Sequence, residues 1–313
     1  MRTPVKLGLY GGALAVVFAA SGFAANAIVP EDAVQDWEAA AQHEHAEEDQ
    51  GMDATGHADH GAAGLGLEAE GYRLDGVSAP DEVGEEGTIA LTILDPAGAP
   101  VTDFETSHEQ ELHLILVRAD GAEFAHAHPE MDAEGEWTLP WTWEAAGAYR
   151  LYADIVPAGG EAVTLSTTVQ VAGDYSPERF EAPVAEASVD GFDVALEGDL
   201  VAGESSPVSI SVSRDGEPVD ALEPYLGAYG HLVALRQGDL AYLHVHPQGE
   251  EPAPGETGGP TVDFAVTAPT AGAYLLYLDF QVDGQVHTAG FVVDAAVGGH
   301  GGDAHENGED HEH

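Results

Sequence analysis

Cysteine is absent from this chain of 313 residues, and methionine occurs only three times. Without thiols the chain can form no disulfide, no thiolate zinc site, no iron–sulfur cluster and no cysteine nucleophile. With so few thioethers it also lacks the methionine-rich surface that copper(I) carriers prefer. Any metal ion must therefore be held by imidazole and carboxylate groups.

Positive charge is almost as scarce. The chain has 8 Lys and Arg against 57 Asp and Glu, which gives a formal net charge of -49. Nucleic acid is excluded as a partner because phosphate binding needs the opposite sign. Acidity of this size attracts cations, although a surface adapted to high salt is the favoured explanation of it.

The N-terminal segment predicts export. Arg2 and Lys6 precede an uncharged stretch at 7–29, and acidic residues follow it. Positive residues on the N-terminal side place the rest of the chain outside the cytoplasm. Residues 25–27 resemble a signal-peptidase site, whereas the whole stretch is long enough to span a bilayer as a helix. We favour an uncleaved anchor at 1–29 and a single-pass location in the cell membrane; cleavage would give a secreted protein.

Two segments rich in acidic, small and histidine residues flank the central part of the chain. Residues 30–67 predict a flexible spacer, and residues 297–313 predict a disordered tail. Half of the histidines lie in them, namely His43, His45, His57, His60, His300, His305, His311 and His313. Their irregular spacing is typical of weak metal collection rather than of one fixed site.

The central part of the chain repeats itself. Residues 113–129 match residues 231–247 without a gap, and residues 146–154 match residues 271–279. The second half carries a longer loop between the two matching blocks. Duplication of one domain explains the pattern.

Each half reads as about seven short strands separated by turn signals, with no helical period. We therefore expect an all-β chain with two tandem immunoglobulin-like antiparallel β-sandwiches, at 68–174 and 184–296, joined by a linker at 175–183. The strands expected in the first half are 72–78, 87–94, 113–117, 123–128, 137–143, 147–155 and 162–171.

The expected hairpin geometry brings the histidines of each repeated motif together and so predicts two candidate sites. Asp120-Gly121 and Gly238-Asp239 are strong two-residue turn sequences. The first turn places position 113 opposite 128, and the second places 231 opposite 246. Histidines two residues apart on one strand share a face. The two predicted trios are His113, His126 and His128 in the first sandwich, and His231, His244 and His246 in the second.

Three converging imidazoles suit zinc or copper(II) far better than calcium or magnesium. A His-x-His pair followed by proline can also simply end a strand with polar residues. Here a third histidine joins each pair through the register, and the whole set recurs, which favours a metal site in each sandwich.

Further groups are expected near the trios. Asp154 and Asp279 are the predicted fourth groups, either as ligands or as acceptors of a ring N–H, because their strand should neighbour the one that starts at His113 or His231. His287 and His108 are extra candidates of lower rank, because neither has a counterpart in the other repeat. By contrast, we expect the four tyrosines to be sandwich core or corner residues and the three tryptophans to have packing roles, namely Tyr149, Tyr152, Tyr274, Tyr277, Trp137, Trp141 and Trp143.

The exported sandwich character and the two histidine sets resemble the small exported immunoglobulin-like copper proteins of the YtkA-like and CopC-like group. The resemblance covers each sandwich and not the tails. It implies the general role of binding copper outside the cytoplasm. CopC-like domains use an N-terminal histidine ligand, and here a membrane segment and spacer occupy that end, so the resemblance assigns no particular ligand.

The sequence thus predicts an extracytoplasmic protein that binds copper(II) or zinc for buffering, scavenging or delivery, with one site per sandwich. Its expected partners are the metal ion, the membrane through the N-terminal helix, and a metal transporter or acceptor protein. The alternative is a non-catalytic structural or adhesion-type tandem module on the cell surface without a metal. No enzyme is expected, because no separate general base or nucleophile motif accompanies the histidines.

Overall fold

The computed structural model describes residues 64–180, 182–243, 245–249, 251–253 and 255–298. The predicted anchor at 1–29, most of the predicted spacer and the tail from 299 onward lie outside the described residues. Over the described part no helix is long and apolar enough to cross a membrane. The anchor and the cell-membrane location stay predictions.

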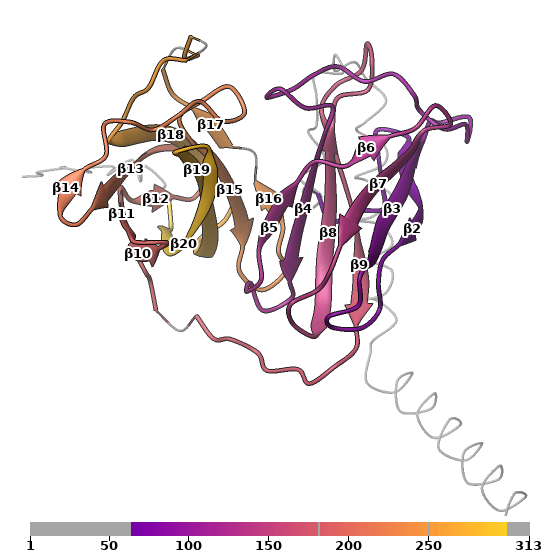
Figure 1. Cartoon of the computed structure of the whole chain (residues 1–313), viewed down its shortest axis with the longest axis horizontal. Coiled ribbons are helices and arrows are strands. Elements are labelled where there is room, and N and C mark those ends of the chain that lie inside the picture. The colour runs from indigo at the N-terminus through magenta and orange to yellow at the C-terminus, as the bar shows by residue number, and fades with distance from the viewer. Residues whose placement is uncertain (1–63, 181, 244, 250, 254, 299–313) are drawn as a thin grey trace, which may run out of the picture. The chain divides into compact units, whose positions relative to one another are not determined.

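The first sandwich consists of two antiparallel sheets, with strand orders β1-β2-β3-β7-β6 and β5-β4-β8-β9 (Figure 1). Its strands are β1 (Glu68–Ala69), β2 (Tyr72–Ser78), β3 (Gly87–Leu94), β4 (Leu112–Arg118), β5 (Ala125–Ala127), β6 (Glu130–Met131), β7 (Glu136–Trp141), β8 (Gly147–Ile155) and β9 (Val163–Val171).

The second sandwich repeats this arrangement. One sheet has the order β10-β11-β13-β18-β17, with β14 paired to β13, and the other has the order β12-β20-β19-β15-β16. Its strands are β10 (Glu186–Val189), β11 (Phe192–Glu197), β12 (Leu200–Val201), β13 (Ser205–Arg214), β14 (Glu217–Pro218), β15 (His231–Arg236), β16 (Tyr242–Leu243), β17 (Val245–Pro247), β18 (Thr261–Thr267), β19 (Gly272–Val282) and β20 (Gln285–Ala296).

The prediction of two tandem immunoglobulin-like sandwiches is confirmed. Strands β2, β3 and β8 have the predicted bounds, and the other expected strands differ by a few residues at their ends. The alternation of buried and less buried residues along the strands explains this agreement. In β11 (Phe192–Glu197), for example, every second residue is buried. A strand with one face on a core and one in solvent has this period of two.

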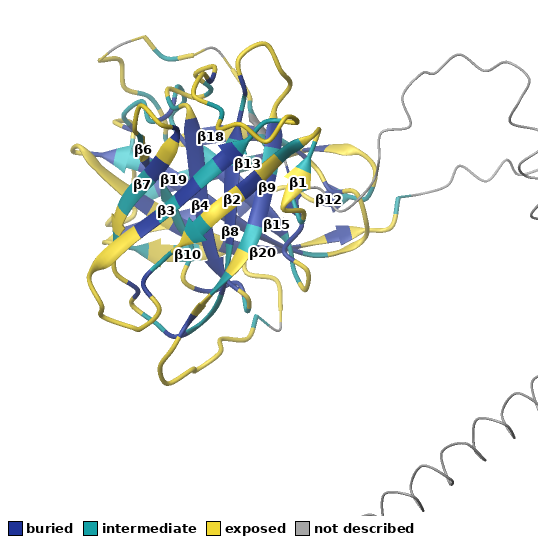
Figure 2. Cartoon of the chain, turned by 90° about the vertical axis from the view of Figure 1, so that its right-hand side faces the viewer, coloured by how far each residue is buried: buried dark blue, intermediate teal, exposed yellow. Residues whose placement is uncertain are grey.

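Each sandwich has its own apolar core, and the buried residues concentrate on the sheets (Figure 2). The phenol group of Tyr149 donates to the carbonyl of Ala145 at 2.9 Å, and that of Tyr274 donates to the carbonyl of Thr270 at 2.8 Å. These equivalent bonds are the tyrosine corners of immunoglobulin-like domains, as expected for these two tyrosines.

A third apolar cluster joins the two sandwiches. It contains residues of β4 and β8 from the first sandwich and of β15, β16, β19, β20 and the β15–β16 loop from the second, namely Ile115, Val117, Tyr152, Val233, Leu235, Leu240, Tyr242, Leu275, Tyr277 and Val292. Strand β4 is consequently buried over all seven residues, because its own core covers one face and the second sandwich covers the other.

Directional contacts fix this interface. The hydroxyl of Tyr152 donates to the carbonyl of Leu240, and the hydroxyl of Tyr277 donates to the carbonyl of Gly121. Phe124 stacks on Tyr277 with ring centroids 4.1 Å apart. Burial raises the pKa of both tyrosines, so their hydroxyls stay protonated donors. Tyr152 and Tyr277 therefore belong to the interface and not to the sandwich cores, which corrects the expectation for this pair.

Replacement of Ile115 by Ala tests the interface. Ile115 is fully buried in the shared cluster, so Ile115→Ala should lower the free energy of unfolding by about 2–5 kcal/mol, as in other cores. Guanidinium denaturation measures it. The control is Val286→Ala on a side chain that is 44% exposed, where we expect a change within about 0.5 kcal/mol. An equally small effect at Ile115 would show that the second sandwich does not cover this face.

Candidate metal centre

The β4–β5 hairpin has the predicted register. Ile115 pairs with His126, and this pairing sets His113 opposite position 128 when it is continued by two residues along each strand. Directly opposite residues project from the same face of a sheet. The side chains of His113, His126 and His128 therefore emerge on the face that the second sandwich covers.

The loop of this hairpin differs from the predicted two-residue turn. The backbone N–H of Gly121 donates to the carbonyl of Arg118 at 2.7 Å, and Glu123 has a left-handed φ of 51°. The Arg118 guanidinium also binds the Asp120 carboxylate at 2.8 Å. The extra left-handed residue after the turn restores the register that a two-residue turn would have given.

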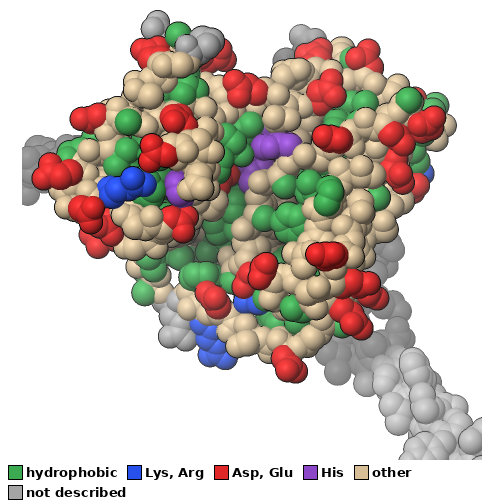
Figure 3. Space-filling view, viewed as in Figure 1, with side chains coloured by type: hydrophobic (Ala, Val, Ile, Leu, Met, Phe, Trp, Pro, Cys, Tyr) green, Lys and Arg blue, Asp and Glu red, His purple; other side chains and the backbone are tan. Residues whose placement is uncertain are grey.

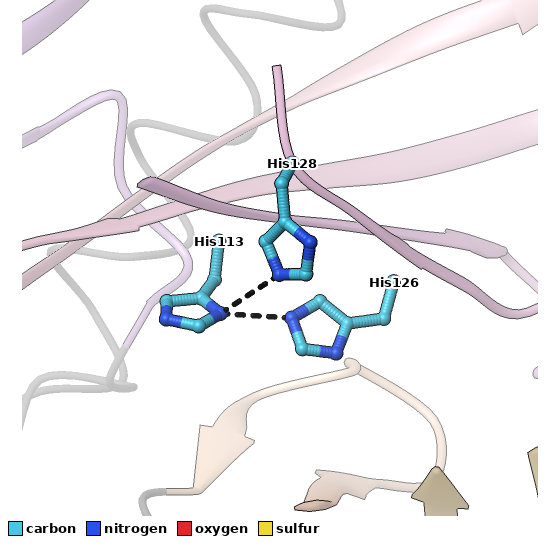
Figure 4. Close-up of side chains that lie close together, drawn as sticks. All are labelled: His113, His126 and His128. Carbon is cyan, nitrogen blue, oxygen red and sulfur yellow. Dashed lines mark hydrogen bonds between the residues drawn. The ribbon is translucent and has the colours of Figure 1, made fainter. Parts of the chain in front are cut away.

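Three imidazole nitrogens converge as predicted (Figure 4). Nδ1 of His113 lies 3.0 Å from Nε2 of His126 and 3.3 Å from Nε2 of His128. Nitrogens bound to one ion at 2.0–2.1 Å lie about 2.9 Å apart at a right angle and about 3.4 Å apart at the tetrahedral angle. Both approaches to His113 thus have the spacing of ligands on a common ion.

The outer nitrogens of two rings are already engaged. Nε2 of His113 lies 2.9 Å from the carbonyl oxygen of Ser107, to which it can only donate. Nδ1 of His126 lies 2.9 Å from a carboxylate oxygen of Asp279, and both of these side chains are at most 2% exposed. The hydroxyl of Thr288 donates to the other carboxylate oxygen at 2.6 Å.

These bonds fix the tautomers of the neutral rings. Because His113 donates through Nε2 and His126 donates through Nδ1, their facing nitrogens both carry lone pairs. Two lone pairs at 3.0 Å repel each other. A cation between them, either a proton on one of the rings or a metal ion bound to both, would relieve this repulsion.

Burial disfavours a proton on His113 or on His128. It lowers the pKa of His113 to about 3 and that of His128 to about 4, with neighbouring imidazoles lowering both further. Burial also holds the pKa of His231 well below its usual range. These rings are neutral at pH 7, which is the form that binds metal ions.

The second sandwich contributes an imidazole to the same cluster. The ring of His231 lies with its centroid 4.8 Å from that of His126 and 5.6 Å from that of His113, nearly parallel to the latter. His108 adds a fifth ring at 5.4 Å from His231. Histidine side chains accordingly gather in the hollow between the two sandwiches, on a face otherwise rich in acidic groups (Figure 3).

The second hairpin starts in the predicted register and then departs from it. Ala234 pairs with Leu243 between β15 and β16, as the predicted turn requires. Strand β17, however, pairs with β18 in the opposite sheet. The chain has therefore crossed between the sheets directly after β16.

This crossing changes the predicted register between His231 and His246. His246 pairs with Ala265 of β18, so the predicted pairing of His246 with His231 is wrong. His244 lies outside the described residues, and the side chain of His246 is not described. Their roles as ligands stay predictions.

The two aspartates occupy the predicted strand positions but have other partners. Asp154 lies opposite His113, and Asp279 lies opposite His231. We expected each to serve its own sandwich. Asp279 instead reaches across the interface to His126. It is Asp279, and not Asp154, that supplies the carboxylate beside the first trio.

Asp154 is engaged elsewhere. It accepts a hydrogen bond from the Thr164 hydroxyl at 2.7 Å, and it forms a side-chain hydrogen bond with Tyr242 of the second sandwich. Burial and this carboxylate raise the pKa of Tyr242 well above its usual range. Asp154 thus supports the interface through Tyr242.

His287 does not join the cluster over the described residues. It pairs with Phe280, which is adjacent to Asp279 on β19 and points into the core of the second sandwich. Alternation directs His287 to that same face, away from the interface. There it packs on Phe192 at 4.8 Å, and its Nδ1 lies 2.8 Å from the Asp190 carboxylate.

Comparison with known families gives one match. The model of a family described as a domain of unknown function (DUF8832) matches residues 68–173 and again residues 187–297. No curated protein matches significantly.

Solved structures resemble the chain only remotely. Invasin, titled a bacterial integrin-binding protein, is 14% identical with a TM-score of 0.22 over 72% of this chain and 39% of its own. InvD from Yersinia pseudotuberculosis is 12% identical with a TM-score of 0.23 over 74% and 59%. Fibronectin(III)-like modules of CbhA from Clostridium thermocellum are 16% identical with a TM-score of 0.20 over 77% and 100%. The chain spans less than two thirds of the length of the first two.

Acid should destabilise the metal-free protein before its carboxylates titrate. In the folded protein the pKa of His113 is about 3 and that of His128 is about 4, below the ordinary value of 6.5. At a pH between the folded-state value and 6.5, the unfolded chain therefore binds more protons than the folded protein does. Stability must then fall as the pH drops below about 6.5. Guanidinium denaturation at pH 7.5, 6.5 and 5.5 with a chelator measures this slope. His128→Gln should flatten it; a slope unchanged by this variant would contradict the burial of a neutral ring.

Proposed function

We propose that the two domains of this chain, which belongs to the DUF8832 family and carries its domain twice, together hold one divalent transition-metal ion. The ion is copper(II) or zinc, and it lies where the two sandwiches meet. The observation that carries the proposal is the approach of Nδ1 of His113 to Nε2 of His126, 3.0 Å apart, while the other nitrogen of each ring is engaged as a donor. A metal ion converts this repulsive contact into two coordinate bonds.

The surroundings of the trio support a metal site. Metal-binding histidines usually donate their other ring N–H to a carboxylate or backbone carbonyl, which fixes the tautomer and the ring orientation. Asp279 does this for His126, and the carbonyl of Ser107 does it for His113. Both rings are therefore oriented before any ion arrives.

The donor set narrows the choice of metal. Imidazole suits copper and zinc, whereas calcium and magnesium take oxygen ligands. The nitrogen spacings of 3.0 and 3.3 Å lie between the right-angle spacing of tetragonal copper(II) and the tetrahedral spacing of zinc. The site fits either ion.

The role we propose is to hold the ion for buffering, scavenging or delivery, without catalysis. His231 lies beside the trio without belonging to it, and no separate general base or nucleophile motif accompanies the histidines in the sequence. The export segment of the sequence would place this activity outside the cytoplasm. A metal transporter or acceptor protein is the partner that delivery requires.

Metal titration of full-length variants tests the function. In a background with the eight tail histidines replaced by Ser, the chain should bind about one equivalent of copper(II) or zinc. Asp279→Asn keeps the shape of the side chain but removes the carboxylate behind His126, and should weaken binding about 10–100-fold. His126→Gln should weaken it further, because a ligand is lost.

The matched control is His287→Gln, which removes a buried histidine that is bonded to Asp190 and lies on the other face of the sheet. Its affinity should equal that of the background protein. Isothermal titration calorimetry gives both the affinity and the stoichiometry. Failure of the folded background protein to bind either ion would refute the metal site and support the alternative, a structural or adhesion-type tandem module.

A further inference from the structure

We propose that His108 and His231 form an outer pair of imidazoles through which the ion enters and leaves the trio of His113, His126 and His128. This inference rests on the proposed metal-binding function and adds a route to it. Neither residue belongs to the trio, and His108 has no histidine counterpart in the other repeat.

His108 occupies a constrained position on the surface. Ser107 and Gln110 exchange two backbone hydrogen bonds of 2.8 and 3.0 Å, which closes a tight turn around His108 and Glu109. Both turn residues are exposed and have left-handed φ angles of 47° and 66°. Asn and Gly are the usual residues of such a turn. His108 adopts this left-handed conformation, in which histidine is enriched among the non-glycine residues.

The second sandwich has an equivalent turn without a histidine. Tyr225 and Ala228 exchange the same pair of backbone bonds around Leu226 and Gly227, both with left-handed φ. The fold therefore does not require a histidine in this turn. The imidazole of His108 is a property of one repeat, on the side where the trio lies.

The turn is tied directly to the trio. Ser107, the residue before His108, provides the carbonyl that accepts the Nε2 proton of His113. The exposed imidazole and the group that orients a buried ligand are thus neighbours in one rigid turn.

Ring distances allow the ion to be handed on without release. Two imidazoles that share one ion at 2.0–2.1 Å have centroids no more than about 6.4 Å apart. His108 is 5.4 Å from His231, and His231 is 4.8 Å from His126. At each handover a new nitrogen–metal bond can form before the old one breaks, and the charge of the ion does not change.

The surroundings of His108 favour the arrival of cations. It lines a groove of about 360 Å³ together with Glu251 and Asp263 of the second sandwich. Carboxylates at the mouth of a groove raise the local concentration of cations. The route therefore runs from an acidic groove through His108 and His231 to the buried trio.

Rapid-mixing kinetics test this route in the full-length background without tail histidines. Copper(II) quenching of tryptophan fluorescence reports loading, and transfer to a chelator reports release. His108→Asn retains a residue suited to a left-handed turn, and should slow loading and release about tenfold each. The dissociation constant and the paramagnetic resonance spectrum of bound copper(II) should match the background protein. His231→Gln should slow both steps as well.

Glu109→Asn is the matched control, since it alters the neighbouring position of the same turn and one charge but keeps His108. Its rates should equal those of the background protein. Unchanged rates in His108→Asn, or an altered copper spectrum that makes His108 a permanent ligand, would overturn the outer pair while leaving the metal site intact. Absence of copper binding in every protein, the background included, would overturn both proposals.

Discussion

The packing of one sandwich on the other is the interaction on which the rest of the structure depends. The sheet with β4 and β8 lies against the sheet with β15 and β19, and an apolar cluster containing Ile115 and Val233 fills the space between them. Burial of apolar area drives such an association without giving it direction. The hydrogen bonds of Tyr152 and Tyr277 across the interface supply the direction. The histidines lie beside this cluster, so their environment is a consequence of it.

The same packing makes the histidine cluster costly without a cation. It removes water from His113 and brings the buried carboxylate of Asp279 to His126. A buried polar group needs a partner, and two lone pairs that face each other provide none for one another. A metal ion between the rings would relieve this repulsion and add its binding energy to the folded state. On the proposed function, the interface would orient the ligands and at the same time favour the metal-bound form.

Duplication has not produced two equal sites among the described residues. His113 and His231 are equivalent in the repeats, yet their rings stack on each other at 5.6 Å within one cluster. The first hairpin continues through His126, whereas in the second repeat β17 joins the opposite sheet after Leu243. One repeat thus supplies the trio, and the other supplies Asp279 and His231. Such a division makes the centre dependent on both domains, which agrees with a chain that carries the domain twice.

The sequence by itself determined the strands, the two-domain repeat and the first trio. Alternating burial locates strands, and a short hairpin sets its register through a few local residues, so His113, His126 and His128 could be placed on one face. Only the tertiary structure decided which carboxylate forms a hydrogen bond with this trio. Asp279 lies 153 positions from His126, and no local pattern states which faces of two sandwiches meet. One signal was present: β4 and β15 are apolar at successive positions, LHLILVR and HLVALR, which is typical of strands covered on both faces. That pattern shows that something packs on the sheet; only the folded chain identifies it as the second sandwich.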